Sequence, residues 1–206
     1  MRLFLVRHGE TAWNFEKRLT GHSDVPLSAL GEQQARLLGA RLADQALDAV
    51  YASDLQRAAG TAELILAGRG PEVTRDAAWR EINYGAWDGL TAVEIQTRFP
   101  GELEARAVNP DGWAPSGGET RRAMHTRITA AIQILRMRHP GGTVLLVTHS
   151  GVLDVIYRWL NGRDLPGRAS ERNANGALSR IDWDAEVPQI AFWNDVGHLR
   201  EPPPLG

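Results

Sequence analysis

Two histidines follow the most apolar short runs of the sequence. His8 comes after LFLV and has Arg7 directly before it, and His149 comes after LLVT. Each is followed within two residues by a glycine, which lets backbone N–H groups approach a ligand closely. An imidazole can act as a nucleophile that accepts a phosphoryl group, and a fixed guanidinium can hold the oxygens of that group during transfer. One histidine after a strand is most often structural, but two in the same setting indicate a site for phosphoryl transfer.

A second arginine can reach the same site. Arg57 lies one helical turn beyond Ser53, in the segment SDLQR that follows the apolar run AVYAS. A planar guanidinium suits phosphate because it donates two parallel hydrogen bonds. The alternative is an arginine on the exposed face of the helix, and the residue types alone leave both open.

The sequence lacks the motifs of several other enzyme classes. It contains none of the motifs typical of serine hydrolases, P-loop nucleotide hydrolases, dinucleotide-binding domains or zincin proteases. The chain has no cysteine, so thiolate chemistry and cysteine metal sites are excluded. His8, His149 and one carboxylate could bind zinc, but Arg7 beside His8 disfavours a cation. We therefore expect no metal and no cofactor.

The elements that must position these residues alternate between short apolar runs and longer helical patterns. Strands are expected at residues 2–6, 49–53 and 143–149, and helices from Ser28 to about Gln45, about Asp54 to Leu66, about Glu119 to Arg138 and Val152 to Leu160. Fully apolar strands need cover on both faces, so the pattern predicts a three-layer α/β/α sandwich with a mostly parallel central sheet. Ligands bind at the carboxyl ends of the strands in such a sheet.

The rest of the chain adds a capping box and a C-terminal extension of the sheet. Thr91 and Glu94 have capping-box spacing, which predicts a helix start. Residues 176–184 and 189–194 have the pattern of two amphipathic strands that could extend the sheet, and residues 201–206 are expected to be a poorly ordered tail.

Composition sets the class of protein. The 206 residues are 43% hydrophobic and 23% charged, which suits one globular domain. With 25 acidic against 23 basic side chains, nothing favours binding to nucleic acid or to an anionic membrane. The first residues lack the apolar core typical of a signal peptide, no apolar run approaches the length of a membrane span, and the absence of cysteine fits a reducing compartment. We therefore expect a cytoplasmic protein.

Five motifs in order resemble the histidine phosphatase superfamily, specifically its phosphoglycerate-mutase-like branch. They are RHGET with WN at 7–14, LTG at 19–21, SDLQR at 53–57, EINYGAWDG at 81–89 and THSG at 148–151. The resemblance covers nearly the whole chain. It implies a single domain over residues 1–206, with a small helical lid inserted at about 88–120 over the carboxyl ends of the strands.

The resemblance also implies a role for each matching residue. His8 would be the nucleophile that becomes phosphohistidine, and Glu81 would give a proton to the leaving oxygen. Arg7, Arg57 and a protonated His149 would hold the phosphoryl oxygens. The substrate-binding residues would be Asn14, Thr20, Gly21, Ser150 and Gly151.

The reaction expected from these residues is hydrolysis of a small phosphorylated metabolite. Between Asp88 and Thr120 the only basic residues are Arg98 and Arg106, against six acidic ones. Such a lid would hold a doubly charged phosphoglycerate poorly. A cofactor-dependent phosphoglycerate mutase is the first alternative. A catalytically silent phosphate-binding module is the second, and it is disfavoured because every expected catalytic residue is present.

Two further points stay open at this stage. Phe99 and Trp113 in the lid could stack on a leaving group, although a place in a small lid core is the simpler interpretation. An edge strand or the C-terminal hairpin could pair with a second copy, so a homodimer is possible, and the sequence does not decide the oligomeric state.

Overall fold

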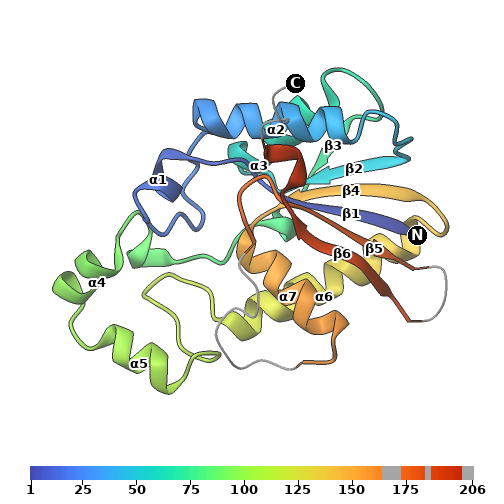
Figure 1. Cartoon of the computed structure of the whole chain (residues 1–206). Helices are drawn as coiled ribbons and strands as arrows, with labels where there is room; N and C mark the ends of the chain where they lie inside the picture. The colour runs from blue at the N-terminus through green and yellow to red at the C-terminus, as the bar shows by residue number, and fades with distance from the viewer. Residues whose placement is uncertain (164–172, 184–186, 201–206) are drawn as a thin grey trace.

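A central sheet of six strands organises the computed structural model, which describes residues 1–163, 173–183 and 187–200 (Figure 1). In chain order the strands are β1 (Arg2–Arg7), β2 (Ala49–Ala52), β3 (Val73–Arg75), β4 (Thr143–Thr148), β5 (Leu178–Asp182) and β6 (Gln189–Asp195). Their order across the sheet is β3-β2-β4-β1-β5-β6. The first four run parallel, β5 is antiparallel to β1, and β6 is antiparallel to β5. The predicted mostly parallel sheet, with two added C-terminal strands, is confirmed.

Two of the helices begin at side-chain caps that the sequence predicts, Ser28 and Thr91. The α-helices are α1 (Ala12–Phe15), α2 (Ala29–Arg41), α3 (Gln56–Leu66), α4 (Ala92–Arg98), α5 (Glu102–Val108), α6 (Arg121–Arg138) and α7 (Ser150–Leu160), and three short 3-10 turns occupy Ala77–Trp79, Gly85–Trp87 and Gly197–Leu199. Ser28 caps α2, Thr91 forms a capping box with Glu94, and Thr120 caps α6. Helix α2 ends at Arg41, four residues before the predicted end.

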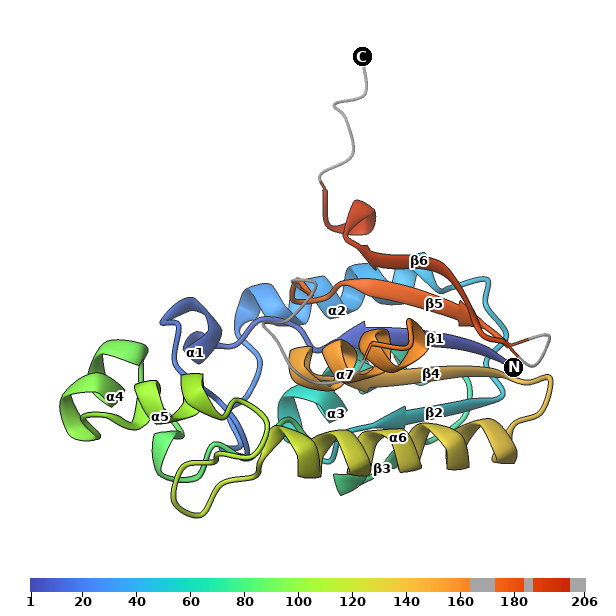
Figure 2. The ribbon, with the colours of Figure 1, turned by 90° about the horizontal axis from the view of Figure 1, so that it is seen from below.

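Two apolar cores lie on the two faces of the sheet, because successive strand residues point to opposite sides. Leu5 of β1 and Leu146 of β4 pack with α6 and α7, whereas Val6 and Val147 pack with α2 and α3. Figures 1 and 2 show these two pairs of helices on opposite faces of the sheet. The predicted three-layer sandwich is therefore confirmed.

Helices α4 and α5 lie beyond the end of the sheet at which β1 and β4 finish (Figure 1, green). They have a small apolar core of their own, formed by Trp87, Leu90 and Ile95, with partly buried Phe99 and Trp113 packed against it. Phe99 and Trp113 therefore pack in the lid core, which is the simpler of the two interpretations that the sequence leaves open.

Two further expectations concern the C-terminal tail and membrane-spanning helices. Residues 201–206, expected to be a poorly ordered tail, lie outside the described residues. Within the described ranges, no helix combines the length and the apolar character needed to cross a membrane.

Candidate active site

The pairing of β1 with β4 brings the two predicted histidines together. Arg7 is in register with Thr148, so the residues that follow them leave the sheet side by side. The backbone N–H of His8 donates to the Thr148 carbonyl at 2.9 Å, and the rings of His8 and His149 lie 5.1 Å apart at 62°. Both side chains are buried, with 4% and 0% exposed. The two histidines form one site at the carboxyl ends of the central strands.

His8 is held as a neutral imidazole. Its Nδ1 lies 2.7 Å from the carbonyl oxygen of Gly9. Because a carbonyl only accepts, Nδ1 carries the ring proton and Nε2 keeps its lone pair. Burial, followed by the charges of Arg57 and Arg7, lowers the pKa of His8 well below 6.5. A nucleophilic nitrogen is therefore present at neutral pH.

His149 has the opposite tautomer. Nε of Arg57 donates to its Nδ1 at 3.3 Å, so Nδ1 is unprotonated and Nε2 carries the hydrogen. Burial, and then the charge of Arg57, lowers the pKa of His149 well below 6.5. The expected protonated His149 is thus wrong for this structure, because a second cation against Arg57 is disfavoured. His149 serves as a neutral N–H donor.

Arg57 is a buried residue of the site, with 1% exposed, and not a surface arginine. Its Nη1 and Nη2 donate to the carbonyls of Ser23 and Gly21, each at 2.7 Å. Burial lowers the pKa of Arg57 to about 10, so the side chain remains a cation at neutral pH. The loop at 21–23 is anchored in turn by Asp88, whose Oδ2 accepts from the backbone and the hydroxyl of Ser23 at 2.9 and 3.0 Å. Asp88 therefore holds the loop that holds Arg57.

Two buried N–H groups at the site lack a hydrogen-bond partner in the described part of the chain. They are Nε of Arg7 and Nε2 of His149. A buried donor left unpaired costs about 1–3 kcal/mol, and an anion between the two would remove that cost. Arg7 is itself fixed, because its Nη1 donates to the Asn173 carbonyl at 2.6 Å. The site is built to accept the oxygens of an anion.

A cavity of about 150 Å³ lies at these groups. Its lining residues are Arg7, His8, Asn14, Arg18, Leu19, Thr20, Gly21, Arg57, Glu81, Tyr84 and His149. Eight of the ten predicted site residues therefore meet around one small cavity. The two exceptions, Ser150 and Gly151, line an adjacent cavity that also contains Glu81.

Asn14 is oriented by a residue that the sequence analysis missed. The side-chain oxygen of Asn14 accepts from the Thr11 backbone at 3.1 Å and from Nδ2 of Asn175 at 3.0 Å, which leaves its amide N–H groups as donors. Asn175 Nδ2 also reaches the carbonyls of His8 and Gly9 at 3.1 and 3.3 Å. The only signal in the sequence is the turn dipeptide Asn175-Gly176, which indicates a turn and no contact.

Glu81 is fixed through both carboxylate oxygens. Oε1 accepts from the Ile82 backbone at 2.9 Å, and Oε2 accepts from the Gly151 backbone at 3.0 Å. A Cβ on Gly151 would lie 2.2 Å from Oε1, so only glycine allows this approach. The backbone carbonyl of Glu81 accepts from Nε2 of His22 at 3.0 Å. Gly151 thus positions the carboxylate that the family pattern makes a proton donor.

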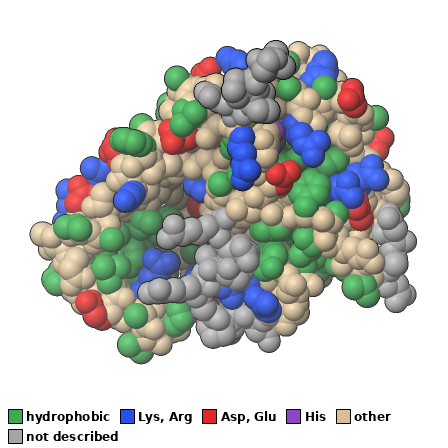
Figure 3. All heavy atoms as spheres, in the orientation of Figure 1, with side chains coloured by type: hydrophobic (Ala, Val, Ile, Leu, Met, Phe, Trp, Pro, Cys, Tyr) green, Lys and Arg blue, Asp and Glu red, His purple; other side chains and the backbone are tan. Residues whose placement is uncertain are grey.

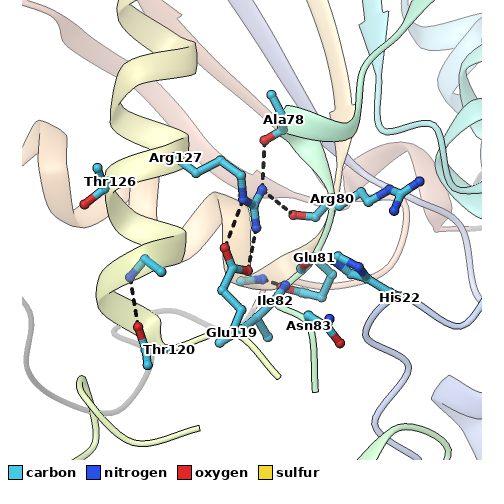
Figure 4. Close-up of polar contacts among 12 residues, drawn as sticks. His22, Ala78, Arg80, Glu81, Ile82, Asn83, Glu119, Thr120, Thr126 and Arg127 are labelled. Carbon is cyan, nitrogen blue, oxygen red and sulfur yellow. Dashed lines mark hydrogen bonds and ion pairs between the residues drawn. The ribbon is translucent and has the colours of Figure 1, made fainter. Parts of the chain in front are cut away.

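An arginine of α6 holds the segment that carries Glu81 (Figure 4). Arg127 donates to the carbonyls of Ala78 and Arg80 at 2.9 and 3.0 Å. Its guanidinium also forms a two-point ion pair with Glu119, at 3.1 and 2.7 Å. The segment is therefore fixed to the helix layer just before Glu81, through an ion pair that the sequence analysis does not predict.

The alternative of a zinc site finds no support. In the described ranges, no three His, Asp or Glu side chains are grouped as metal ligands. Arg7 and Arg57 place positive charge beside both histidines, which disfavours a cation there.

Comparisons with known proteins agree with this geometry. The family model of the histidine phosphatase superfamily (branch 1) matches residues 3–196. Phosphoglycerate mutase-like protein 4 of Arabidopsis thaliana is 37% identical over 204 residues, which are 97% of this chain and 87% of that protein. The solved structure of Bacillus stearothermophilus YhfR is 35% identical with a TM-score of 0.90 and covers 97% of this chain and 99% of its own. The solved structure of the alpha-ribazole phosphatase from Shigella flexneri is 30% identical with a TM-score of 0.89, and the match covers 95% of this chain and 96% of that one. The chain therefore belongs to the histidine phosphatase superfamily, branch 1, and is an enzyme of the histidine phosphatase type.

Proposed function

We propose that the protein is a metal-independent phosphomonoesterase that hydrolyses a small phosphorylated metabolite through a phosphohistidine intermediate. The observation that carries the proposal is the state of His8. Its Nδ1 donates to Gly9, its Nε2 keeps a lone pair, and two guanidinium groups lie beside it. A neutral nitrogen nucleophile next to fixed cations suits attack on a phosphate ester.

In the first step Nε2 of His8 attacks phosphorus, and the P–N bond forms as the ester P–O bond breaks. Arg7, Arg57 and the N–H of His149 stabilise the charge on the phosphoryl oxygens. Protonated Glu81 gives its proton to the leaving oxygen, and the alcohol departs.

In the second step water attacks the phosphohistidine, and the P–N bond breaks as a new P–O bond forms. Glu81, now a carboxylate, takes the proton of the attacking water. Inorganic phosphate leaves, and His8 returns to its neutral form. The positive charge that a metal ion supplies in many phosphoryl-transfer enzymes comes here from Arg7 and Arg57.

The names of the relatives support this class of reaction but differ on its outcome. One similar structure is that of an alpha-ribazole phosphatase, and one relative is named phosphoglycerate mutase-like. Hydrolysis is favoured over mutase activity because a mutase must protect its phosphohistidine from water, and the lid over the site carries few basic residues for a bisphosphorylated ligand. A phosphate-binding module without catalysis would need no neutral His8 aimed at the ligand.

The test is the variant His8→Ala, assayed with p-nitrophenyl phosphate. The expected loss is at least about 10³-fold in kcat, because the nucleophile is removed. The wild-type enzyme, quenched during turnover with labelled ester, should contain an acid-labile phosphohistidine. His125→Ala, on α6 and outside the cavity, is the matched control and should keep full activity.

Three results would overturn the proposal. Retained turnover in His8→Ala would remove the nucleophile. Interconversion of phosphoglycerates faster than their hydrolysis, with bisphosphoglycerate present, would indicate a mutase. Vanadate binding by a wild-type protein that hydrolyses no phosphate monoester would indicate a silent module.

A further inference from the structure

Loop 18–23 and the first residues of the lid, 88–90, lie side by side and are joined by backbone hydrogen bonds. The N–H of Gly89 donates to the carbonyl of Leu19 at 2.7 Å, and the N–H of Leu19 donates to the carbonyl of Leu90 at 3.0 Å. The first four residues of this loop also line the small cavity at the histidines, the phosphoryl pocket. The start of the lid is therefore docked on a wall of that pocket.

Asp88, the first residue of the lid, adds side-chain contacts to this junction. Its Oδ2 accepts from the backbone N–H and the hydroxyl of Ser23 at 2.9 and 3.0 Å. A Cβ on Gly21 would lie 2.3 Å from Oδ1 of Asp88, and Gly21 has a φ of +39°, so the close approach of carboxylate and loop requires glycine. Asp88 thus lies against both residues whose carbonyls accept from Arg57.

These two carbonyls hold the terminal nitrogens of Arg57. Nη1 donates to Ser23 and Nη2 donates to Gly21, each at 2.7 Å, and Nε donates to His149 at 3.3 Å. None of the ion pairs between described residues includes Arg57. The place of this guanidinium beside His8 therefore depends on the loop.

Apolar packing contributes little to the junction between the lid and the rest of the molecule. Among the described residues, only the partly buried Tyr84 packs against both the lid core and the core formed by α6 and α7. Figure 3 shows hydrophobic and basic side chains at the surface between the lid, at the left, and the rest of the molecule. The hydrogen bonds of residues 88–90 are therefore a direct connection between the lid and the phosphoryl pocket.

Building on the proposed phosphatase activity, we propose that Asp88 is a positioning residue through which the lid controls Arg57. With residues 88–90 docked, the carbonyls of loop 18–23 hold the guanidinium beside His8, where it stabilises the phosphoryl oxygens. When residues 88–90 leave the loop, those carbonyls lose their support and the guanidinium loses its fixed place. The phosphoryl pocket is thus complete only while the lid is docked.

The variant Asp88→Ala removes the carboxylate and keeps the backbone of the lid. We expect single-turnover release of nitrophenolate from p-nitrophenyl phosphate to slow about 10- to 100-fold, since a displaced guanidinium stabilises the transferring group poorly. The pKa of His8 should rise, because burial and then the charge of Arg57 lower it, and vanadate should bind more weakly. Asp88→Asn keeps an oxygen that can accept from Ser23 and should restore most of the rate.

Loop 18–23 also reaches Glu81, because Nε2 of His22 donates to the Glu81 carbonyl at 3.0 Å. A loss confined to alkyl esters would show that Asp88 acts through Glu81 and would overturn the inference. A double-mutant cycle tests the route through Arg57 directly. Asp88→Ala should slow the Arg57→Gln enzyme no further, and a fully additive loss would contradict the inference.

Asp48→Ala is the matched control. Oδ2 of Asp48 accepts from the backbone N–H of Thr143 at 2.7 Å, at the end of β4 away from the pocket. This variant also loses a bond from a carboxylate to a backbone N–H, but it should leave the rate, the pKa of His8 and the affinity for vanadate unchanged. Rate losses in both variants that follow their losses of thermal stability would show that Asp88 serves stability alone.

A milder variant gives the same test if Asp88→Ala does not fold. Ser23→Ala removes the hydroxyl bond to Asp88 and keeps the carbonyl that accepts from Arg57. It should produce the same changes to a smaller extent. An unchanged pKa of His8 together with an unchanged rate in Ser23→Ala would contradict the inference.

Failure of the proposed function is a separate result, namely no hydrolysis of any phosphate monoester by the wild-type protein. The coupling is then tested by titration of His8 in nitrogen NMR spectra and by calorimetry with vanadate, on the wild type and Asp88→Ala. The same pKa of His8 and the same affinity for vanadate in both proteins would overturn it.

Discussion

His8 and His149 have equivalent places in the sequence, but the structure gives them different chemistry. Each ends a central strand, and each is buried. The Gly9 carbonyl accepts from Nδ1 of His8, whereas Arg57 donates to Nδ1 of His149. One ring therefore offers a lone pair at Nε2 and the other offers an N–H. The centres of these two rings lie 5.1 Å apart, so the lone pair and the N–H belong to one site.

This difference predicts opposite tautomers in nitrogen NMR spectra. We expect His8 to carry its proton on Nδ1 and His149 on Nε2. Since burial and the guanidinium charges hold both pKa values well below 6.5, both rings should stay neutral from about pH 8 to about pH 6.5 and gain protons only at lower pH. Activity that depends on neutral His8 should therefore persist through pH 6.5 and be lost only as the pH approaches the lowered pKa of His8.

Burial is the main cause of the lowered pKa of His8, and the variant Arg57→Gln tests the smaller contribution from charge. Without one of the two positive charges, the pKa of His8 should rise toward its ordinary value, because the imidazolium is less strongly disfavoured. Two results would contradict the opposite tautomers and the lowered pKa of His8. One is the same tautomer in both rings, and the other is titration of His8 above pH 6.5 in the wild-type protein.

At the scale of single residues, the sequence predicts the side chains that line the cavity and misses those that hold them in place. Arg7, His8 and His149 follow apolar strands, and that pattern is visible without a structure. Asn175 and Arg127 act through contacts with residues far away in the chain, at His8 and Ala78. Nothing in their own neighbourhoods marks such contacts, so only the fold shows them.

Among the elements, α6 matters because it fixes the segment before Glu81. Arg127→Ala would leave the Ala78 and Arg80 carbonyls and the Glu119 carboxylate without their shared partner. We expect kcat for an alkyl phosphate to fall about 10- to 100-fold, since a misplaced Glu81 protonates the leaving oxygen poorly. Single-turnover release of nitrophenolate from p-nitrophenyl phosphate should change little, because nitrophenolate departs without a proton and Glu81 acts as a base only after that step.

Two variants make this prediction specific. Arg127→Lys keeps the charge but loses the planar fork, so it should restore activity only in part. Arg36→Ala removes an exposed arginine paired with Glu32 on α2 and should leave both substrates unaffected. An equal loss in alkyl-ester turnover and in single-turnover nitrophenolate release would show that Arg127 serves stability alone.

The elements that the sequence predicts are those with a strong local signal. The strands β1 and β4 are continuous apolar runs, and α2, α4 and α6 begin at side-chain caps. Strand β3 was missed because it has three residues at the sheet edge and buries none of them fully. Helix α5 was missed because it begins at Gly101 without a side-chain cap and buries no residue fully. Pairing and packing, more than local preference, form these two elements.

On the scale of the whole molecule, the lid and the sheet have separate apolar cores. Trp87, Leu90 and Ile95 form the lid core, and only the partly buried Tyr84 packs against both this core and the one formed by α6 and α7, among the residues that the structure describes. A small core stabilises its element less than a large one, and such regions open at a lower free-energy cost than the global fold. We propose that residues 88–120 form a lid within a single domain that opens as a unit while the sheet stays folded.

Amide hydrogen exchange tests this division. In the wild-type protein, α4 and α5 should exchange faster than β1 and β4. Ile95→Ala removes a side chain that is 1% exposed, at a cost of about 2–5 kcal/mol. That cost should speed exchange in the lid and leave the central strands protected.

The control is Leu146→Ala, at a position with 0% exposed in the larger core, which should instead speed exchange in the strands. Equal loss of protection in β4 and α4 after Ile95→Ala would mean that the lid and the sheet unfold together, and that the site cannot open without losing the fold that positions His8.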